Sequence, residues 1–409
     1  MSKNKISQPK IRFKEFSGEN AEAWEQRKAS ELFKSISDKN HPNLPVLSAS
    51  QEKGMILRDD IGIDIKYDHK SLSNYKRVTP GQFVIHLRSF QGGFADSQME
   101  GITSPAYTVI DFKEKDQSHS LFWKEILTSQ SFIKRLETVT YGIRDGRSIS
   151  FSDFSTLKFI VPKLDEQEKI AVLFKILNQT ITLHQRKLEA LENLKKTLLS
   201  KMFPKNGRAV PELRFAGFTD NWEQRKLGEV SERVSGNDGR MELPTLTISA
   251  GMGWLDQRER FSGNKAGKEQ KNYTLLSENE LSYNRGNSKL AKYGVVFKLS
   301  THKEALVPRI YHSFRTTKEA DPDYIEYMFA TRLPNRELGK LVTSGARMDG
   351  LLNINYDDFI GIKIKIPSLA EQSEIGMLFI QLDKLITLHQ RKIEQYQELK
   401  KTLLSKMFI

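Results

Sequence analysis

Two glycine-rich loops that carry basic and polar side chains occur in each half of the chain. The first is Arg88-Ser-Phe-Gln-Gly-Gly-Phe94, matched by Arg285-Gly-Asn-Ser-Lys-Leu-Ala-Lys-Tyr-Gly294. The second is Thr140-Tyr-Gly-Ile-Arg-Asp-Gly-Arg147, matched by Thr343-Ser-Gly-Ala-Arg-Met-Asp-Gly350. Glycine allows close approach of the backbone to a ligand, and Arg, Lys, Asn, Gln and Ser donate hydrogen bonds to phosphates and base edges. Basic glycine turns are common, so it is their recurrence at matching places that predicts contact with DNA.

The candidate DNA-binding residues are the hydrogen-bonding side chains of these loops, together with the residue that precedes one of them. They are Arg88, Ser89, Gln91, Arg144, Arg147, Asn284, Arg285, Ser288, Lys289, Lys292, Ser344 and Arg347.

Motifs for catalysis are absent from the sequence. No glycine loop for a methyl-donor cofactor and no Asn/Asp-Pro-Pro-aromatic motif for base flipping is present. The nearest match to a nucleotide-binding P-loop, Gly263-Asn-Lys-Ala-Gly-Lys268, is one residue short and is followed by Glu269. The eight histidines are scattered, without metal-ligand spacing. We therefore expect a chain that binds its target without catalysing a reaction and without a metal or cofactor of its own.

The composition favours a polyanionic partner. The 409 residues include 64 Lys and Arg against 51 Asp and Glu, a formal net charge of +13. The absence of cysteine, of a long apolar run and of an apolar leader predicts a cytoplasmic protein with no membrane partner. An ordinary basic protein that scaffolds other proteins, and a divergent nuclease, are the alternatives. Salt-sensitive duplex binding would exclude the first, and magnesium-dependent cleavage would reveal the second.

The chain is an imperfect internal repeat. Trp24-Glu-Gln-Arg-Lys28 returns as Trp222-Glu-Gln-Arg-Lys226, an offset of 198 residues, and Ile181-Thr-Leu-His-Gln-Arg-Lys187 returns from Ile386 to Lys392, an offset of 205. The stretches between these repeated segments share few identical residues and differ in length. A duplicated frame that holds two unlike inserts predicts two similar tasks with different specificities, whereas simple drift would not spare the frame.

Each repeat ends in an apolar pattern whose steps alternate between four and three residues, which is the heptad seam of a coiled coil. The pattern predicts two helices of about 36 residues, or about 50 Å each. The seam residues are Ile170, Phe174, Leu177, Ile181, Leu188, Leu191, Leu198, Ile375, Phe379, Leu382, Ile386, Ile393 and Leu403.

Connectivity indicates how these helices pair. The second insert follows the first helix closely and leads into the second helix, so an antiparallel pair is the simplest arrangement, with a parallel homodimeric coil as the alternative. His184 and His389 fall in the middle of the seam, where we expect polar residues that set the register.

Each insert mixes short strands with one amphipathic helix, which gives an α/β or α+β class. We expect strands at Phe83–Leu87 and Leu157–Val161, with counterparts at Leu281–Tyr283 and Ile360–Ile366. We expect helices at residues 121–139 and 323–342.

Taken together, these loops and repeated segments resemble the specificity subunits of type I restriction–modification systems. The resemblance is carried by the two pairs of loops, by Ser104-Pro-Ala-Tyr107, by the Pro-x-Leu-x-Glu-Gln entries at Pro162 and Pro367, and by the repeated Leu-His-Gln-Arg-Lys. It covers essentially the whole chain in family order. Two departures weaken the transfer of individual residues. The second counterpart of Ser-Pro-Ala-Tyr is Val307-Pro-Arg-Ile-Tyr311, and the loops at Arg88 and Arg285 differ in length.

The resemblance implies two target-recognition domains in a pseudo-two-fold arrangement, separated by the two long helices, that read the halves of an interrupted site in double-stranded DNA. It also implies two docked copies of an adenine methyltransferase subunit that holds S-adenosylmethionine, and restriction subunits that use ATP and magnesium. The implied divisions are a frame segment at 1–28, the first recognition domain at 29–163, the first helix at 164–204, a frame segment at 205–228, the second recognition domain at 229–368 and the second helix at 369–409.

Overall fold

A computed structural model of the chain describes residues 9–18, 22–50, 53–61, 69–86, 93–136, 150–205, 207–261, 267–342 and 351–408. The chain separates into two compact units. The first unit is Met1–Gln185 together with Arg391–Ile409, and the second unit is Arg186–Gln390. Each unit therefore contains one copy of the insert, the start of its own long helix and the end of the other one.

The repeated Trp-Glu-Gln-Arg-Lys motif forms a strand that closes the base of each insert. Strand β1 (Glu25–Lys28) pairs antiparallel with β10 (Lys158–Val161), so that Lys28 lies opposite Lys158. Strand β11 (Glu223–Lys226) pairs in the same way with β20 (Lys363–Ile366). Each insert thus begins and ends at a pair of antiparallel strands, which we call its neck. We call residues 29–157 the first cassette and residues 227–362 the second cassette.

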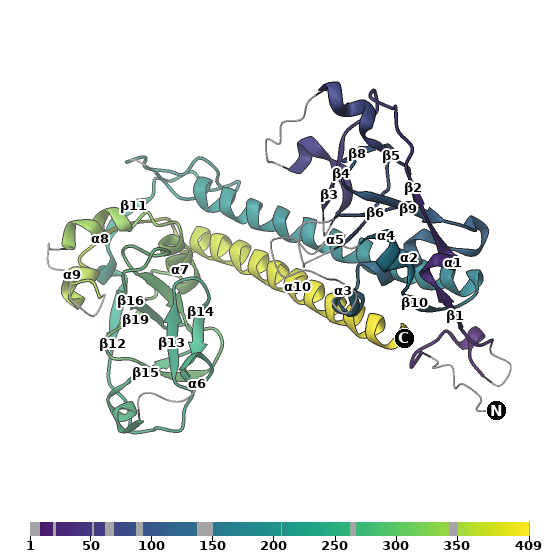
Figure 1. Cartoon of the computed structure of the whole chain (residues 1–409). Coiled ribbons are helices and arrows are strands. Elements are labelled where there is room, and N and C mark those ends of the chain that lie inside the picture. The colour runs from purple at the N-terminus through teal and green to yellow at the C-terminus, as the bar shows by residue number, and fades with distance from the viewer. Residues whose placement is uncertain are drawn as a thin grey trace. The chain divides into compact units, whose positions relative to one another are not determined.

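Both cassettes have the same sheet topology, a four-stranded antiparallel sheet with two smaller ribbons (Figure 1). The four-stranded sheets run β2-β9-β6-β7 (Phe33–Ile36, Thr108–Phe112, Phe83–Ile85, Phe94–Asp96) and β12-β19-β16-β17 (Ser231–Val234, His312–Thr316, Leu281–Asn284, Val295–Lys298). The ribbons pair β3 with β4 (Leu47–Ser50, Gly54–Leu57), β5 with β8 (Lys76–Val78, Gly101–Thr103), β13 with β14 (Leu246–Ser249, Gly253–Asp256) and β15 with β18 (Thr274–Ser277, Glu304–Val307).

The expected amphipathic helix is broken in both cassettes, so the prediction of one continuous helix was wrong. It is replaced by α2 (Ser120–Leu127) and α3 (Gln130–Leu136) in the first, and by α7 (Pro322–Ala330) and α8 (Asn335–Leu341) in the second. Thr128 and Ser129 end α2 by hydrogen bonding back to carbonyls of its last turn. Arg332, with a φ of 63°, and Pro334 end α7.

The remaining helices are short. They are α1 (Ala29–Leu32), α4 (Phe151–Ser155), α6 (Gln257–Phe261) and α9 (Tyr356–Ile360), with single 3-10 turns η1 (Lys14–Phe16), η2 (Arg58–Ile61), η3 (His69–Asn74), η4 (Lys115–Gln117), η5 (Leu227–Glu229) and η6 (Gly267–Asn272).

The long helices are α5 (Leu164–Lys201) and α10 (Leu369–Met407), labelled in Figure 1. Every predicted seam residue is buried or half-buried, and exposed residues stand between them, which confirms the heptad pattern. The helices run antiparallel in both units. In the first unit the ring of Phe174 contacts that of Phe408 and His184 stacks on Tyr396 at 5.7 Å. In the second unit Lys195 binds Asp383.

Each unit has its own apolar core, and both long helices contribute to it. Phe174 and Met407 lie in the core of the first unit, and Met202 and Phe379 lie in that of the second. A side chain from the frame then fixes the start of each helix. Arg12 donates two hydrogen bonds of 2.7 Å to the buried Glu166 carboxylate, and Arg214 does the same to Glu371 at 2.6 and 2.7 Å. The predicted mixed class with two repeated domains is confirmed.

Candidate nucleic-acid interface

The loop at Arg285 leaves the four-stranded sheet of the second cassette at the end of β16 and returns at β17. Its return is a place where only glycine fits. Gly294 has a φ of +78°, and a Cβ there would lie 2.5 Å from the Asn284 carbonyl oxygen and 2.6 Å from the Tyr283 ring. The Tyr283 ring in turn stacks on Phe359 with centroids 4.4 Å apart. A buried aromatic layer therefore holds both ends of this loop.

Arg285 connects the two loops that sequence reasoning treated separately. Its guanidinium is half-buried, and Nη1 donates to the carbonyl oxygens of Leu352 and Ile354 at 3.5 and 3.1 Å. The Arg285 carbonyl accepts the Leu352 N–H at 2.9 Å. His312 Nε2 also donates to the Ile354 carbonyl oxygen at 2.9 Å, and burial lowers the pKa of this imidazole. Arg285 thus positions the residues that follow the second loop, and its contact with DNA stays a prediction.

The exposed part of the loop is a tight turn with basic flanks. The backbone N–H groups of Ser288 and Ala291 bind each other's carbonyls at 3.1 Å, and the Ser288 hydroxyl also accepts from Ala291. Lys289 and Lys292 project from this turn and are exposed. Because the turn is closed by its own hydrogen bonds, it presents these two ammonium groups from a fixed backbone.

A neighbouring hairpin, β13–β14, is held against this loop. Asn284 Nδ2 donates to the Ile248 carbonyl at 3.2 Å, and the Tyr311 hydroxyl accepts the Ile248 N–H at 3.1 Å. Tyr311 ends the segment that departs from Ser-Pro-Ala-Tyr, yet it closes the same turn. Its N–H binds the Pro308 carbonyl as that of Tyr107 binds Ser104. The departure in sequence therefore leaves the local structure intact.

The first cassette builds the corresponding loop from β6 and β7, and the His86 N–H binds the Gly93 carbonyl at 3.1 Å across its base. Equal offsets of 198 residues relate β16 to β6. Arg88 lies outside the described residues, so its correspondence with Arg285 stays a prediction.

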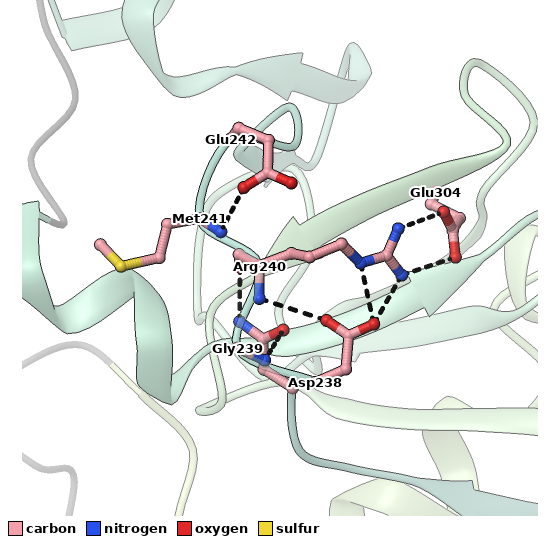
Figure 2. A network of polar contacts seen from close by, with 7 residues as sticks. Asp238, Gly239, Arg240, Met241, Glu242 and Glu304 are labelled. Atoms are coloured by element: carbon pink, nitrogen blue, oxygen red, sulfur yellow. Dashed lines mark hydrogen bonds and ion pairs between the residues drawn. The ribbon is translucent and has the colours of Figure 1, made fainter.

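A charge cluster closes the second cassette where the loop after β12 meets β18 (Figure 2). The Arg240 guanidinium donates to both oxygens of Glu304 at 2.8 and 3.0 Å, and to Asp238 at 2.8 Å. These hydrogen bonds hold the pKa of both carboxyl groups below their usual range. The first cassette has a similar trio, in which Arg77 binds Glu100 and Asp38. The arginine lies on a strand in the first cassette and on a loop in the second. Its glutamate partner directly precedes β8 in the first cassette and is the first residue of β18 in the second. Because Arg240 binds two carboxylates, we assign it a role in stabilising the fold.

Residues 21–193 match the family model described as type I restriction modification DNA specificity domain. Over these residues the chain is similar to the type I restriction–modification specificity family. A relative from Methanocaldococcus jannaschii, the type I restriction enzyme MjaVIII specificity subunit, is 21% identical over 322 residues, which are 75% of this chain and 73% of that protein. The crystal structure of the type I restriction-modification S subunit from M. genitalium has the same fold, with a TM-score of 0.61 over 98% of this chain and 99% of that one at 13% identity.

The predicted DNA-binding residues of the chain fall into two groups. The structure brings Asn284, Arg285, Ser288, Lys289 and Lys292 together at one loop. The others lie outside the described residues, and their assignment stays a prediction. They are Arg88, Ser89, Gln91, Arg144, Arg147, Ser344 and Arg347.

The sequence analysis missed the hairpin tip at Met252, which lies next to the Arg285 loop. The signal available was its Gly-Met-Gly spacing, because a glycine on each side of an apolar residue marks a tight exposed turn. Within the described ranges, no group of three acidic or histidine side chains could hold a metal ion. No helix in the same part of the chain is long and apolar enough to cross a membrane.

Proposed function

We propose that this chain reads an interrupted site in double-stranded DNA, one half with each cassette, and leaves the chemistry to its partners. The observation that carries the proposal is the repeated neck. Both cassettes begin and end on paired strands, share one strand order, and differ in the loops that would reach the bases. Two copies of one fold with different loops are suited to reading two different short sequences at a fixed spacing.

The electrostatics of the chain fit this role. A net charge of +13 and the exposed Lys289 and Lys292 favour phosphate contacts. The isolated chain should bind duplex DNA weakly, lose affinity as salt is added, and neither cleave nor methylate the DNA. Replacing both lysines with alanine should reduce the slope of log K against log salt by about 2. Binding that ignores salt would contradict a phosphate-led interface.

The long helices also carry a repeated apolar surface suited to protein partners. In the first unit Leu183 is 58% exposed, and in the second unit its counterpart Leu388 is 48% exposed. The pairs Val172 and Met377, and Leu194 and Leu399, are likewise exposed at the same offset of 205 residues. Equivalent patches on the two units fit two copies of one partner, as the family implies for the methyltransferase subunit.

In this proposal S-adenosylmethionine belongs to the methyltransferase, and ATP and magnesium belong to restriction subunits that join the complex in the cytoplasm. The chain itself contributes recognition and docking.

The direct test is co-expression of the chain with its neighbouring methyltransferase, followed by mapping of methylated adenines across the host genome. We expect one motif with two short defined halves and an undefined spacer of fixed length. A continuous motif, or no methylation above the methyltransferase alone, would contradict the proposal.

Docking is tested on the same complex by native mass spectrometry. Leu183→Asp or Leu388→Asp alone should reduce the bound methyltransferase from two copies towards one, because each places a carboxylate in one apolar patch. Gln185→Asp and Gln390→Asp, at exposed positions of the same helices, are matched controls and should leave two copies bound. Two copies bound in all four variants would place docking elsewhere.

A further inference from the structure

The second cassette exposes two large apolar side chains at its basic loop and the neighbouring hairpin. Of the large apolar side chains that the structure describes, Met252 and Leu290 are the most exposed, at 73% and 63%. They come from different loops that meet, since a Cβ added to Gly251, the residue before Met252, would lie 3.3 Å from Leu290 Cδ1. Isolated exposed apolar residues need no explanation, but two adjacent ones on turn tips form a contact surface.

Both tips are rigidly supported. The Leu290 carbonyl accepts a hydrogen bond of 3.0 Å from Arg332 Nη2, and Trp254 Nε1 of the hairpin donates to the Lys298 carbonyl at 3.0 Å. Gly253, with a φ of +73°, makes the turn that exposes Met252. A fixed backbone loses little conformational entropy on binding, so it is suited to present apolar groups to a partner.

The surroundings identify that partner as nucleic acid. Lys289 directly precedes Leu290 and Lys292 lies two residues beyond it, both exposed. Phosphates on either side of a groove would pair with such lysines while the apolar groups reach inward. Met and Leu contact DNA either at a thymine methyl group or between the faces of neighbouring bases. Both contacts bury apolar surface against bases.

We propose that Met252 and Leu290 make an apolar contact with the bases of the half-site that the second cassette reads. This inference rests on the proposed function and adds to it an apolar residue of the Arg285 loop, Leu290, and a residue outside the candidate loops, Met252. The first cassette differs at this place. Its hairpin, β3–β4, has Lys53 where the hairpin of the second cassette has Met252. The apolar contact therefore distinguishes how the two halves are read.

The test uses the complex with the methyltransferase and duplexes that contain the mapped motif. Met252→Gln keeps the length of the side chain and removes its apolar character, and Met252→Leu keeps the apolar character. We expect Met252→Gln and Leu290→Ala to weaken binding about tenfold or more, from the lost burial of one apolar side chain, and Met252→Leu to bind within about threefold of wild type. Met241→Ala, which removes an exposed methionine five residues before β13, is the control and should bind as wild type.

Two sets of modified duplexes identify the contact. If the side chains lie between bases, 2-aminopurine at that step brightens on binding wild type and stays dim with Met252→Gln. If they touch a thymine methyl, replacing that thymine with uracil weakens wild type and leaves Met252→Gln unchanged. Either result supports the proposal. Wild-type affinity for Met252→Gln would overturn it, whereas failure of the wild-type complex to prefer the motif over a scrambled duplex would overturn the proposed function itself.

Discussion

In each unit an ion pair joins a strand to a helix, but the charges are exchanged between the two units. In the first unit Asp96 on β7 supplies the carboxylate, and Lys124 on α2 donates to it at 3.0 Å. In the second unit Lys298 on β17 supplies the ammonium group, and Asp323 on α7 supplies the carboxylate. The strand position is the same, since Asp96 lies opposite the first residue of β6 as Lys298 lies opposite the first residue of β16.

A second charged contact, between cassette and long helix, changes in a similar way. In the first unit Lys400 binds Glu125 of α2 at 3.1 Å and the Asn178 side-chain oxygen at 2.8 Å. In the second unit Lys195, the equivalent lysine, binds Asp383 of α10 at 2.5 Å. The acid has moved from the cassette to the long helix.

Tyr327 of α7 occupies the place of Glu125. Its hydroxyl donates to Asp383 at 2.8 Å, and its ring lies 5.4 Å from the Lys195 ammonium group. These exchanges show that compensation occurs within each unit. A single helix or strand moved between units would bring like charges together, whereas a whole cassette carries its partners with it.

The largest expected effect is on the matched pair Phe174 and Phe379. Both side chains are 0% exposed at equivalent positions in the two cores. Phe174→Ala and Phe379→Ala should each lower the free energy of unfolding by about 3–5 kcal/mol through a cavity. Hydrogen exchange should lose protection mainly in the unit that carries the change. A loss below about 1 kcal/mol for either would mean that the two cores are not equivalent.

The next largest effect should be a difference in stability between substitutions of the two equivalent lysines. Lys400→Met leaves Glu125, which is 5% exposed, without its ammonium partner, and should cost about 2–3 kcal/mol. Lys195→Met leaves Asp383, which is 40% exposed, and should cost about 1 kcal/mol or less because water replaces the partner. Urea unfolding of both variants measures the difference. Equal costs would show that burial of the acid does not decide the strength of this contact.

A smaller effect depends on pH and is confined to the second unit. Burial raises the pKa of Glu326 to about 7, and in the unfolded chain a glutamate titrates near 4.3. The folded state holds this proton more tightly, so the second unit loses stability as pH rises from about 4.5 to about 7, and the loss is complete above that range.

Glu326→Gln should therefore raise stability by about 1–2 kcal/mol at pH 8 and change it little at pH 4.5, less than the full shift implies because the side chain keeps some contact with water. Urea midpoints at the two pH values measure this gain. Glu232→Gln on β12, which removes a carboxylate from an exposed site, is the control. A gain for Glu326→Gln that is equal at both pH values would rule out this titration.

The long-range order of the chain was accessible from its sequence because periodicity records it. The repeat and the seam through Phe174 and Phe379 could be read from spacing alone. The neck could not, because Glu25 pairs with Val161 through contacts that no local pattern records. The breaks in the predicted helices depend on single residues, such as Thr128, whose hydroxyl competes for a carbonyl of the last turn.

The candidate site was accessible only in part. Glycines and donors marked the loops, and five of the candidates cluster at one of them. The role of Arg285 in joining two loops depends on where Leu352 and Ile354 fold back, and the adjacency of Met252 and Leu290 requires two turns to meet. Both are tertiary contacts between segments about 40 to 70 residues apart, and propensity says nothing about them.

The central claim is that each cassette reads one half of the site, and exchange of a whole cassette tests it most directly. Residues 29–157 are replaced with the corresponding cassette of a relative, cut at the neck where Ala29 N–H binds the Leu157 carbonyl at 2.7 Å. Adenine methylation is then mapped after co-expression with the methyltransferase. We expect one half of the motif to change to that of the relative, while the other half and the spacer length remain. A change in both halves, or an unchanged motif with full methylation, would contradict it.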